Sequence, residues 1–285
     1  MWSMTSDPLA RGDGPVPRRG YGVRVHWLLC VLAAGPAYGA RGHWQIGMGL
    51  ATFAAPAYPG SDSESVFVYP YPDISYRAPL VHLRRNRVRM RPSVHSRWRF
   101  GMAFNASPPT PAGTPDARRG MPELAPTLAA GPEVLYRLAW RPFGLQTFVG
   151  LHSRFRVAVQ PDFHVDTVGV GGGPFVEWQS RPGARYQMTL GVGPVWRTRG
   201  ENGYFFNVPA AYVRPGRPRY HAAGGYAGAR ATGSVTRQFG RYAVTVFARY
   251  RYYGGAVFRG SPLLKASSTF LCGVAVAWVF IRPAA

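Results

Sequence analysis

Apolar side chains alternate with small or polar ones along most of the chain, most clearly from Ser267 to Phe280. One face of this stretch is bulky and apolar, with Ser268, Phe270, Cys272, Val274, Val276, Trp278 and Phe280. The other face is small, with Thr269, Leu271, Gly273, Ala275, Ala277 and Val279. This period of two predicts a β-strand about as long as a tilted membrane crossing, with its bulky face toward lipid. Taken alone, the stretch is equally compatible with a buried strand of a soluble β-sandwich.

The alternation recurs along the preceding chain and predicts about twelve strands in all. They run His43 to Ala54, Val66 to Tyr76, Leu80 to Met90, Ser93 to Asn105, Leu128 to Trp140, Gly144 to Val159, Val165 to Gln179, Arg185 to Thr198, Tyr204 to Tyr212, Gly224 to Phe239, Tyr242 to Gly254 and Ser267 to Phe280. The predicted fold is all-β: a single antiparallel transmembrane β-barrel of about 12 strands, with about 10 or about 14 also compatible. The last strand is expected to pair with the first. A soluble secreted β-sandwich is the alternative, but it seldom needs strands this long.

Two segments depart from the regular pattern. Pro70 and Pro72 lie inside the second predicted strand, and because proline cannot donate a ladder hydrogen bond, we expect irregular or weak pairing there. The stretch from Ala106 to Pro122 is rich in proline and glycine and is expected to be the longest structureless loop, and a mobile one.

Several strands carry arginine on the face opposite their apolar residues. Arg154 and Arg156 alternate with Phe155 and Val157, and Arg249 and Arg251 lie on one face of a later strand. A buried strand of a soluble protein would not tolerate such a face, whereas a polar lumen would. These four arginines are therefore predicted to point into the lumen, where they would favour anions if a pore exists.

Charge and composition agree with a barrel and argue against nucleic-acid binding. The chain has 35 glycines, 27 prolines and a net charge of +22, and Lys265 is its only lysine. The arginines are spread over the whole length instead of forming one basic stripe or helix, which is not the footprint of a nucleic-acid-binding protein. A lumen lined with arginine, or arginine loops facing outer-membrane lipopolysaccharide, explains the charge more simply.

The N-terminus has the features of an export signal. Arg18, Arg19 and Arg24 precede a short apolar run, Val25 to Ala34, which a small-residue, helix-breaking segment follows. We therefore expect residues 1–40 to be a cleaved signal peptide and residues 41–285 to be a barrel in the outer membrane of a Gram-negative bacterium. Outside the signal only Cys272 remains as a cysteine, so no intramolecular disulfide is expected.

Short motifs give the chain a resemblance to the MipA/OmpV family of outer-membrane proteins. They are Tyr58-Pro59-Gly60-Ser61-Asp62, Gly131-Pro132-Glu133, Tyr204-Phe205, Tyr220 with Ala222 to Gly225, Arg249 to Tyr253 leading to Gly260-Ser261-Pro262-Leu263, and the closing Gly273 to Phe280. Their order and spacing carry the resemblance, which covers residues 43–280. The family's acidic residues before the Ser-Pro are replaced here by Gly255 to Arg259, and the chain continues past Phe280.

The resemblance implies a barrel that scaffolds cell-wall synthesis by linking a murein lytic transglycosylase to a penicillin-binding protein. It also links the closing strand, with Val274, Val276, Trp278 and Phe280, to the signal that the barrel assembly machinery reads. Other family members are described as porin-like or adhesive. Tyr58, Gly60, Ser61 and Asp62 are the candidate interaction residues, although turn formation alone would also account for them.

The sequence contains no recognisable catalytic, metal or cofactor constellation, and no cofactor is expected. The six histidines after the signal are not at metal-ligand spacing. Gly169 to Gly173 lacks the Lys-Ser/Thr of a phosphate loop and is predicted to lie at a crowded barrel wall. Asp162, Asp166 and Glu177 are expected to pair with lumen arginines.

Three functions remain open at this point. The first is a scaffold for periplasmic cell-wall enzymes, and the second is a small channel that prefers anions. The third is an outer-membrane hydrolase, which lacks a recognisable nucleophile and base.

Overall fold

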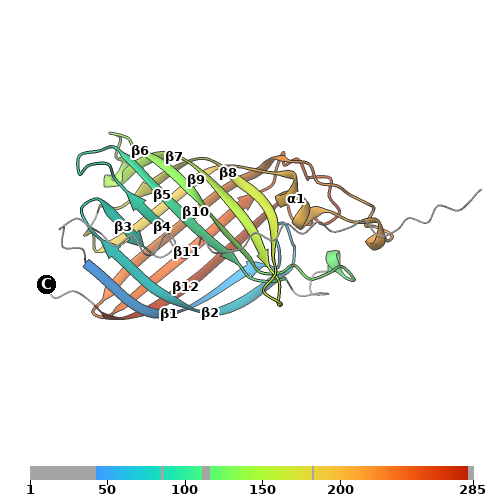
Figure 1. The fold of residues 1–285 in the computed structure, drawn as a ribbon, viewed down its shortest axis with the longest axis horizontal. Coiled ribbons are helices and arrows are strands. Elements are labelled where there is room, and N and C mark those ends of the chain that lie inside the picture. Colours follow the sequence, from blue (N-terminus) through green and yellow to red (C-terminus); the bar gives the residue numbers. More distant parts are fainter. Residues whose placement is uncertain (1–42, 85–86, 111–115, 182, 282–285) are drawn as a thin grey trace, which may run out of the picture. The chain divides into compact units, whose positions relative to one another are not determined.

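The computed structural model describes residues 43–84, 87–110, 116–181 and 183–281, which form a closed antiparallel β-barrel of twelve strands (Figure 1). The strands are β1 (His43–Pro56), β2 (Glu64–Arg77), β3 (Val81–Arg84), β4 (Arg87–Met90), β5 (Trp98–Ser107), β6 (Thr127–Arg137), β7 (Gln146–Val159), β8 (Val165–Gln179), β9 (Tyr186–Arg197), β10 (Gly225–Phe239), β11 (Tyr242–Tyr252) and β12 (Ser268–Ile281). The helices are η1 (Asp116–Arg118), η2 (Pro142–Gly144), α1 (Arg199–Phe206) and η3 (Ala210–Tyr212). The predicted signal peptide lies outside the described residues.

The first and last strands close the barrel, as the sequence predicted. β12 pairs with β1 in antiparallel register, with Leu50 opposite Val276 and Ala54 opposite Cys272. On its other edge β12 pairs with β11, where Val246 lies opposite Val274. Every other neighbour in the barrel is also next in sequence, so the strands run up and down.

Two of the predicted strands were wrong, although the total of twelve is right. The predicted strand from Leu80 to Met90 is a hairpin of two short strands, β3 and β4, of four residues each. The predicted strand from Tyr204 to Tyr212 is instead the end of α1 followed by η3. A short apolar run does not reveal which type of element it forms, and here the buried Phe205 and Phe206 pack into a loop cluster instead of a barrel wall.

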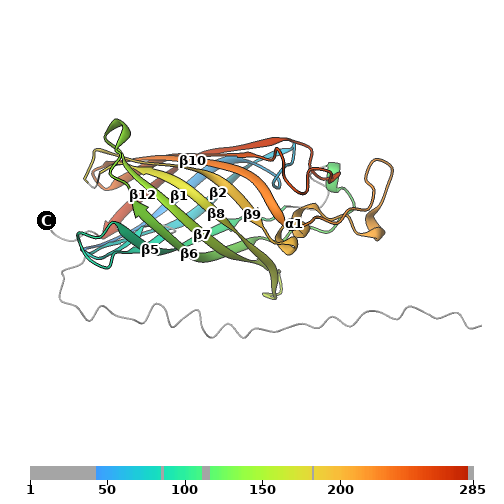
Figure 2. The same ribbon diagram turned by 90° about the horizontal axis from the view of Figure 1, so that it is seen from above.

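The two ends of the barrel differ in the length of their connections (Figure 2). One end carries the start of β1, the end of β12 and the connections 78–80, 91–97, 138–145, 180–185 and 240–241. The other end carries the connections 57–63, 108–126, 160–164, 198–224 and 253–267. Membrane barrels have short periplasmic turns and longer outer loops. We therefore call them the short-turn end and the loop end, and we take the short-turn end as periplasmic.

The outer surface is an apolar band with aromatic residues near both ends. Near the short-turn end the exposed aromatic residues include Trp44, Trp98, Tyr186, Phe239, Tyr242 and Trp278. Near the loop end they are Phe155, Trp196, Tyr250, Tyr252 and Phe270. Between them the surface is aliphatic, as at Leu50, Leu151 and Val246. This is the surface of a barrel that spans a bilayer.

Among the described residues, no helix has both the length and the apolar character that a membrane crossing requires.

The long loops pack on one another and form a cap at the loop end. Its buried cluster comprises Ala57, Tyr58, Ala117, Met121, Leu124, Phe205, Phe206, Val208, Ala222, Ala227, Tyr253, Ala256, Phe258 and Leu263. Phe206 and Phe258 stack with ring centroids 3.9 Å apart. The expectation of a structureless stretch from Ala106 to Pro122 is corrected in its described part, because η1 forms there and Ala117 and Met121 are buried in the cap.

The prolines of β2 have a different effect on each edge of that strand. β2 pairs with β1 along its whole length, with Pro70 opposite Leu50 and no shift of register, so the expected irregularity is absent there. On its other edge, within the described part of the chain, β2 pairs with β3 through residues 75–77. Among the described residues, Pro70 and Pro72 take no part in the β2–β3 pairing, and a position outside such a ladder is where a strand tolerates proline.

Candidate functional site

The lumen nearest the short-turn end contains a layer of ion pairs. Arg87 Nη1 lies 2.5 Å from Glu177 Oε2, and Arg89 contacts Glu133 through Nε at 2.6 Å and Glu177 through Nη2 at 3.0 Å. Both carboxylates are buried. The expected pairing of Glu177 with lumen arginines is confirmed. Asp162 instead lies in the 160–164 turn and Asp166 is the second residue of β8, and both side chains are exposed. Asp166 pairs there with His164 at 3.3 Å.

Helix α1 brings one carboxylate into the lumen from the loop end. Glu201 Oε1 accepts a hydrogen bond from Arg156 Nε at 3.1 Å and lies 3.5 Å from Arg197 Nε. A Cβ at Gly171 would lie 2.4 Å from Glu201 Oε2, and one at Gly169 would lie 2.8 Å from the Glu201 nitrogen. The predicted crowded wall at Gly169 to Gly173 is thus present, and its glycines make room for Glu201.

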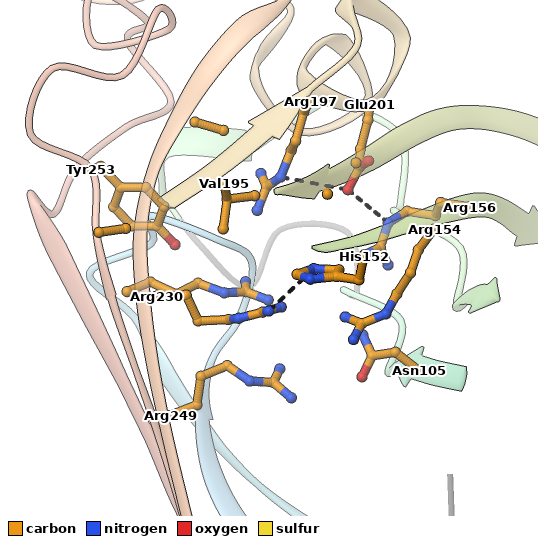
Figure 3. A pocket seen from close by; sticks show the side chains of 15 residues that line it. Asn105, His152, Arg154, Arg156, Val195, Arg197, Glu201, Arg230, Arg249 and Tyr253 are labelled. Atoms are coloured by element: carbon orange, nitrogen blue, oxygen red, sulfur yellow. Dashed lines mark hydrogen bonds and ion pairs between the residues drawn. The ribbon is translucent and has the colours of Figure 1, made fainter. Parts of the chain in front are cut away.

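Arginines on three strands converge on a small cavity next to this carboxylate (Figure 3). Arg154 on β7, Arg230 on β10, and Arg249 and Arg251 on β11 all line the cavity, whose volume is about 50 Å³. Arg230 Nη2 lies 3.3 Å from His152 Nε2. In the described part of the chain no carboxylate is within ion-pair distance of these four arginines, which we call the arginine cluster. The cluster is therefore a concentration of positive charge without a matching anion.

A second and larger cavity, the chamber, lies beneath the cap and shares Arg249 and Arg251 with the first. Its volume is about 470 Å³, and its wall includes Phe53 of β1, Tyr71 of β2 and Phe247 of β11. Cap residues Tyr58 and Phe205 also line it. The chamber thus has an aromatic wall and a cationic edge, and its volume falls within the usual range for small-molecule sites.

The structure places three of the four candidate interaction residues inside the cap. Tyr58 and Ser61 are buried, and the Gly60 carbonyl accepts hydrogen bonds from the Lys265 and Ala266 nitrogens. A Cβ at Gly60, whose φ is +85°, would lie 2.3 Å from Leu264 Cδ1. Asp62 is exposed. The motif therefore holds two loops together, and only Asp62 is placed to meet a partner.

Burial also changes the acid–base behaviour of the cap. Burial raises the pKa of Tyr58 to about 12, against a smaller lowering by the nearby Arg118. The Arg118 guanidinium lies 5.9 Å from the Tyr58 ring centroid, and burial lowers the pKa of Arg118 itself. At neutral pH the buried hydroxyl of Tyr58 is therefore neutral and acts as a hydrogen-bond donor.

The structure places the other candidate residues on opposite faces of the wall. Arg154, Arg156, Arg249 and Arg251 all line the arginine cavity. On β12, Val274, Val276, Trp278 and Phe280 are exposed on the outer surface, while Ala275, Ala277 and Val279 are buried on the inner face. Cys272 is a free, exposed thiol on the outer face.

Sequence reasoning missed several residues of the lumen: Arg87, Arg89, Glu133, Arg197, Glu201 and Arg230. Arg197 is the last residue of β9, and its position gave no sign of a role in the lumen. Arg230 lies among alanines and glycines in β10, so no bulky apolar face identified its orientation. Glu201 lies in a connection that the alternation did not describe.

No metal-binding arrangement is present in the residues that the structure describes, where no three His, Cys, Asp or Glu side chains gather. His152 is buried and lies next to Arg230 of the arginine cluster and to Phe175, whose ring centroid is 5.2 Å away at an interplanar angle of 65°. This histidine is therefore packed as a lumen residue.

Comparison with known proteins gives a family match. A profile of the family described as "MltA-interacting protein MipA" matches residues 48–280. Among curated proteins no match is found.

Solved structures resemble the chain only weakly. The Ralstonia pickettii toluene transporter TbuX is 10% identical at a TM-score of 0.27, and the match covers 82% of this chain and 70% of that one. A Pseudomonas aeruginosa FadL homologue is 9% identical at a TM-score of 0.29, with 74% and 61% covered. The Pseudomonas putida toluene transporter TodX is 8% identical at a TM-score of 0.26, with 88% and 93% covered. Such low TM-scores support no functional conclusion.

Proposed function

The chain belongs to the MltA-interacting protein MipA family, and from that premise we propose that it is an outer-membrane β-barrel that binds a periplasmic MltA-type protein. By resemblance to the family, that partner is a murein lytic transglycosylase, and the barrel links it to a penicillin-binding protein. The proposed role is binding, and it requires a surface at the periplasmic end.

The observation that supports this role is an exposed aromatic pair at the short-turn end. Trp140 and Phe143 lie on the connection between β6 and β7, and Phe143 is fully exposed. The backbone of Phe143 has a φ of 54°, a left-handed conformation that a bulky residue adopts rarely. Strained backbone of this kind is often retained where a side chain must be presented. Exposed Trp and Phe side chains are typical anchors of protein interfaces.

The lumen supports a binding role over a channel. The ion pairs of Arg87 and Arg89 with Glu133 and Glu177 occupy the part of the lumen nearest the short-turn end. The cap covers the loop end. An anion-preferring pore would need a continuous path past both layers. Planar-bilayer recordings on the purified barrel distinguish the two functions, because a steady anion-selective conductance supports the pore and its absence supports the binding protein.

A binding measurement with matched variants tests the proposal. The double variant Trp140→Ala/Phe143→Ala, in nanodiscs, should bind an immobilised MltA-type transglycosylase about tenfold more weakly than the unchanged barrel. The control is Phe163→Ala, because Phe163 is also exposed with a φ of 60° but lies on the 160–164 turn at the loop end.

Heat-modifiable migration on gels shows that each variant barrel is folded. Absence of binding by the unchanged barrel would overturn the proposed partner. Equal weakening by Phe163→Ala would overturn the docking surface.

A further inference from the structure

The arginine cavity holds more positive charge than its carboxylate balances. Its described lining has one carboxylate, Glu201, and six arginines: Arg154, Arg156, Arg197, Arg230, Arg249 and Arg251. Glu201 Oε1 lies 3.1 Å from Arg156 Nε and 3.5 Å from Arg197 Nε, so its charge is shared between those two arginines. The arginine cluster therefore lines the cavity without a counter-charge among the described residues.

Strand pairing forces these cationic side chains together. Arg230 of β10 lies directly opposite Arg251 of β11, and Arg249 lies opposite Thr232, two positions further along the same ladder. Like charges directly opposite each other on paired strands destabilise a sheet. The sequence therefore places positive charges where they lower the stability of the barrel by itself, and a bound anion would relieve that repulsion.

Donors around the cavity also lack hydrogen-bond partners. Arg154 Nε, Arg249 Nε and Arg197 Nη1 are buried and have no partner among the described residues. Arg197 is only 9% exposed as a whole residue. Buried polar groups are normally hydrogen-bonded, because removing them from water without a partner is unfavourable, and more so for a charged group. Unpartnered donors from β7, β9 and β11 that line one cavity are suited to a ligand that accepts hydrogen bonds.

The shape of the cavity selects the kind of anion. Its volume of about 50 Å³ suits a few water molecules or one compact ion, and is far below the roughly 300 Å³ of the smallest usual organic ligand sites. Arg230 and Arg249 extend into it from one side and Arg154 from the opposite side (Figure 3). A carboxylate presents its two oxygens on one side, whereas phosphate and sulfate present oxygens in four directions. Guanidinium groups on opposite sides therefore fit a tetrahedral oxyanion better.

From the charge, the unpartnered donors and the size of the cavity, we propose that the arginine cluster binds a compact tetrahedral dianion of the phosphate or sulfate type. The dianion is a free ion, or the phosphate group of an ester whose remainder lies in the chamber, because the chamber shares Arg249 and Arg251 with the cavity. The site is separate from the exposed Trp140 and Phe143 pair, so the failure of either proposal leaves the other standing.

Equilibrium unfolding in urea, with the barrel in phosphatidylcholine vesicles, tests the site whatever route the ion takes. Phosphate or sulfate at millimolar concentration should raise the urea midpoint, because a ligand that binds only the folded state stabilises it by mass action. The rise should grow with the logarithm of the concentration once the site is filled. Sodium chloride and sodium acetate at the same ionic strength should give no comparable rise. A midpoint that neither dianion moves, or that acetate moves equally, would overturn the proposal.

A matched pair of variants separates the site from general effects of salt. Arg154→Gln/Arg249→Gln should lose most of the phosphate-dependent rise, with the affinity for the dianion reduced roughly tenfold per arginine. In chloride alone this variant should be at least as stable as the unchanged barrel, because two repelling charges are gone. Arg185→Gln/Arg241→Gln, with the same loss of charge at exposed short-turn positions, should keep the full rise. Equal rises in both variants would show that phosphate acts on the whole surface, and would refute the site.

Native mass spectrometry of the unchanged barrel in a neutral detergent tests binding without any variant. A single phosphate or sulfate should stay bound to each barrel, whereas nitrate should not. Retention of neither dianion, or of several copies without a preferred number, would contradict the proposal.

Phenyl phosphate then identifies the source of the dianion. Tighter binding than inorganic phosphate, with the gain lost in Phe247→Ala, supports an ester whose ring lies in the chamber, because Phe247 lines that chamber. Binding no tighter than that of inorganic phosphate supports the free ion.

Discussion

The hydroxyl of Tyr58 donates a 2.6 Å hydrogen bond to the carbonyl of Leu263, which lies 205 residues away in the chain. This contact joins the connection after β1 to the connection before β12. The Ser261 hydroxyl extends the junction by donating to the carbonyl of Phe206 at 2.8 Å. The cap therefore depends on short polar contacts between loops that are far apart in sequence.

Removing the hydroxyl of Tyr58 should loosen the cap without unfolding the barrel. Tyr58→Phe keeps the ring but leaves the Leu263 carbonyl without this donor, at a cost of about 1 kcal/mol. We expect faster trypsin cleavage at Arg259 and Lys265, both in the 253–267 loop, while the heat-modifiable migration of the barrel is unchanged. Tyr242→Phe, at an exposed position on β11, is the control. Equal cleavage rates for the Tyr58 variant and the unchanged protein would contradict the role of this bond.

The same tyrosine gives the cap a defined response to alkaline pH. Burial raises its pKa to about 12, so the folded cap favours the neutral phenol. The neutral Tyr58 side chain contributes its full stabilisation below about pH 10, the pKa of tyrosine in the unfolded chain, and this contribution is lost as the pH rises through about 12. Trypsin cleavage of the loop should therefore increase over this pH interval, relative to a reference substrate, more strongly in the unchanged protein than in Tyr58→Phe. Parallel pH profiles for the two proteins would refute the assignment.

Glu201 compensates two lumen arginines, and its neutralisation should be costly. Its side chain is 4% exposed and faces Arg156 and Arg197, which are 12% and 7% exposed. Glu201→Gln leaves both guanidinium groups without a counter-charge, and breaking a buried pair in this way costs about 3 kcal/mol or more. The expected result is a lower urea midpoint for unfolding of the barrel in vesicles. Glu64→Gln, at an exposed position, should leave the midpoint unchanged.

The glycine opposite Glu201 should be nearly as sensitive. A Cβ at Gly171 would lie 2.4 Å from Glu201 Oε2 and 3.2 Å from Arg197 Cγ, so Gly171→Ala must displace the carboxylate. We expect a loss of about 1 to 3 kcal/mol, the usual cost of overpacking. At Gly233 a Cβ would meet only the end of the Leu190 side chain at 3.3 Å, so Gly233→Ala is the matched control. Equal urea midpoints for the two variants would show that Glu201 can move at no cost.

The alternation of the sequence predicted the wall because lipid imposes a simple requirement on it. Outward residues of a membrane strand are mostly apolar, so Phe270 to Phe280 on β12 could be assigned to the outer face without knowing any neighbour. The same logic placed Arg249 and Arg251 on the inner face, because they alternate with Tyr250 and Tyr252 on β11.

The cap and the lumen contacts could not be predicted in this way. Phe205 and Phe206 form a helix because they pack on Phe258 and the other buried loop residues, contacts that no local pattern contains. The division of this segment into the short strands β3 and β4 was not visible in the apolar run from Leu80 to Met90. Glu201 enters the lumen only because α1 folds back against Gly169 and Gly171.

The outward face of β12 carries the last prediction, which concerns assembly of the barrel. Phe280 is exposed beside Trp278, with ring centroids 5.8 Å apart, at the short-turn end of the strand that closes the wall. The resemblance to outer-membrane proteins links such a closing strand to recognition by the barrel assembly machinery, although Ile281 to Ala285 make this signal internal. Deleting Phe280 should therefore lower the amount of folded barrel in the outer membrane more than deleting Ile281 to Ala285 does. Heat-modifiable bands in isolated outer membranes measure that amount, and equal amounts from the two deletions would show that Phe280 is not the residue that the machinery reads.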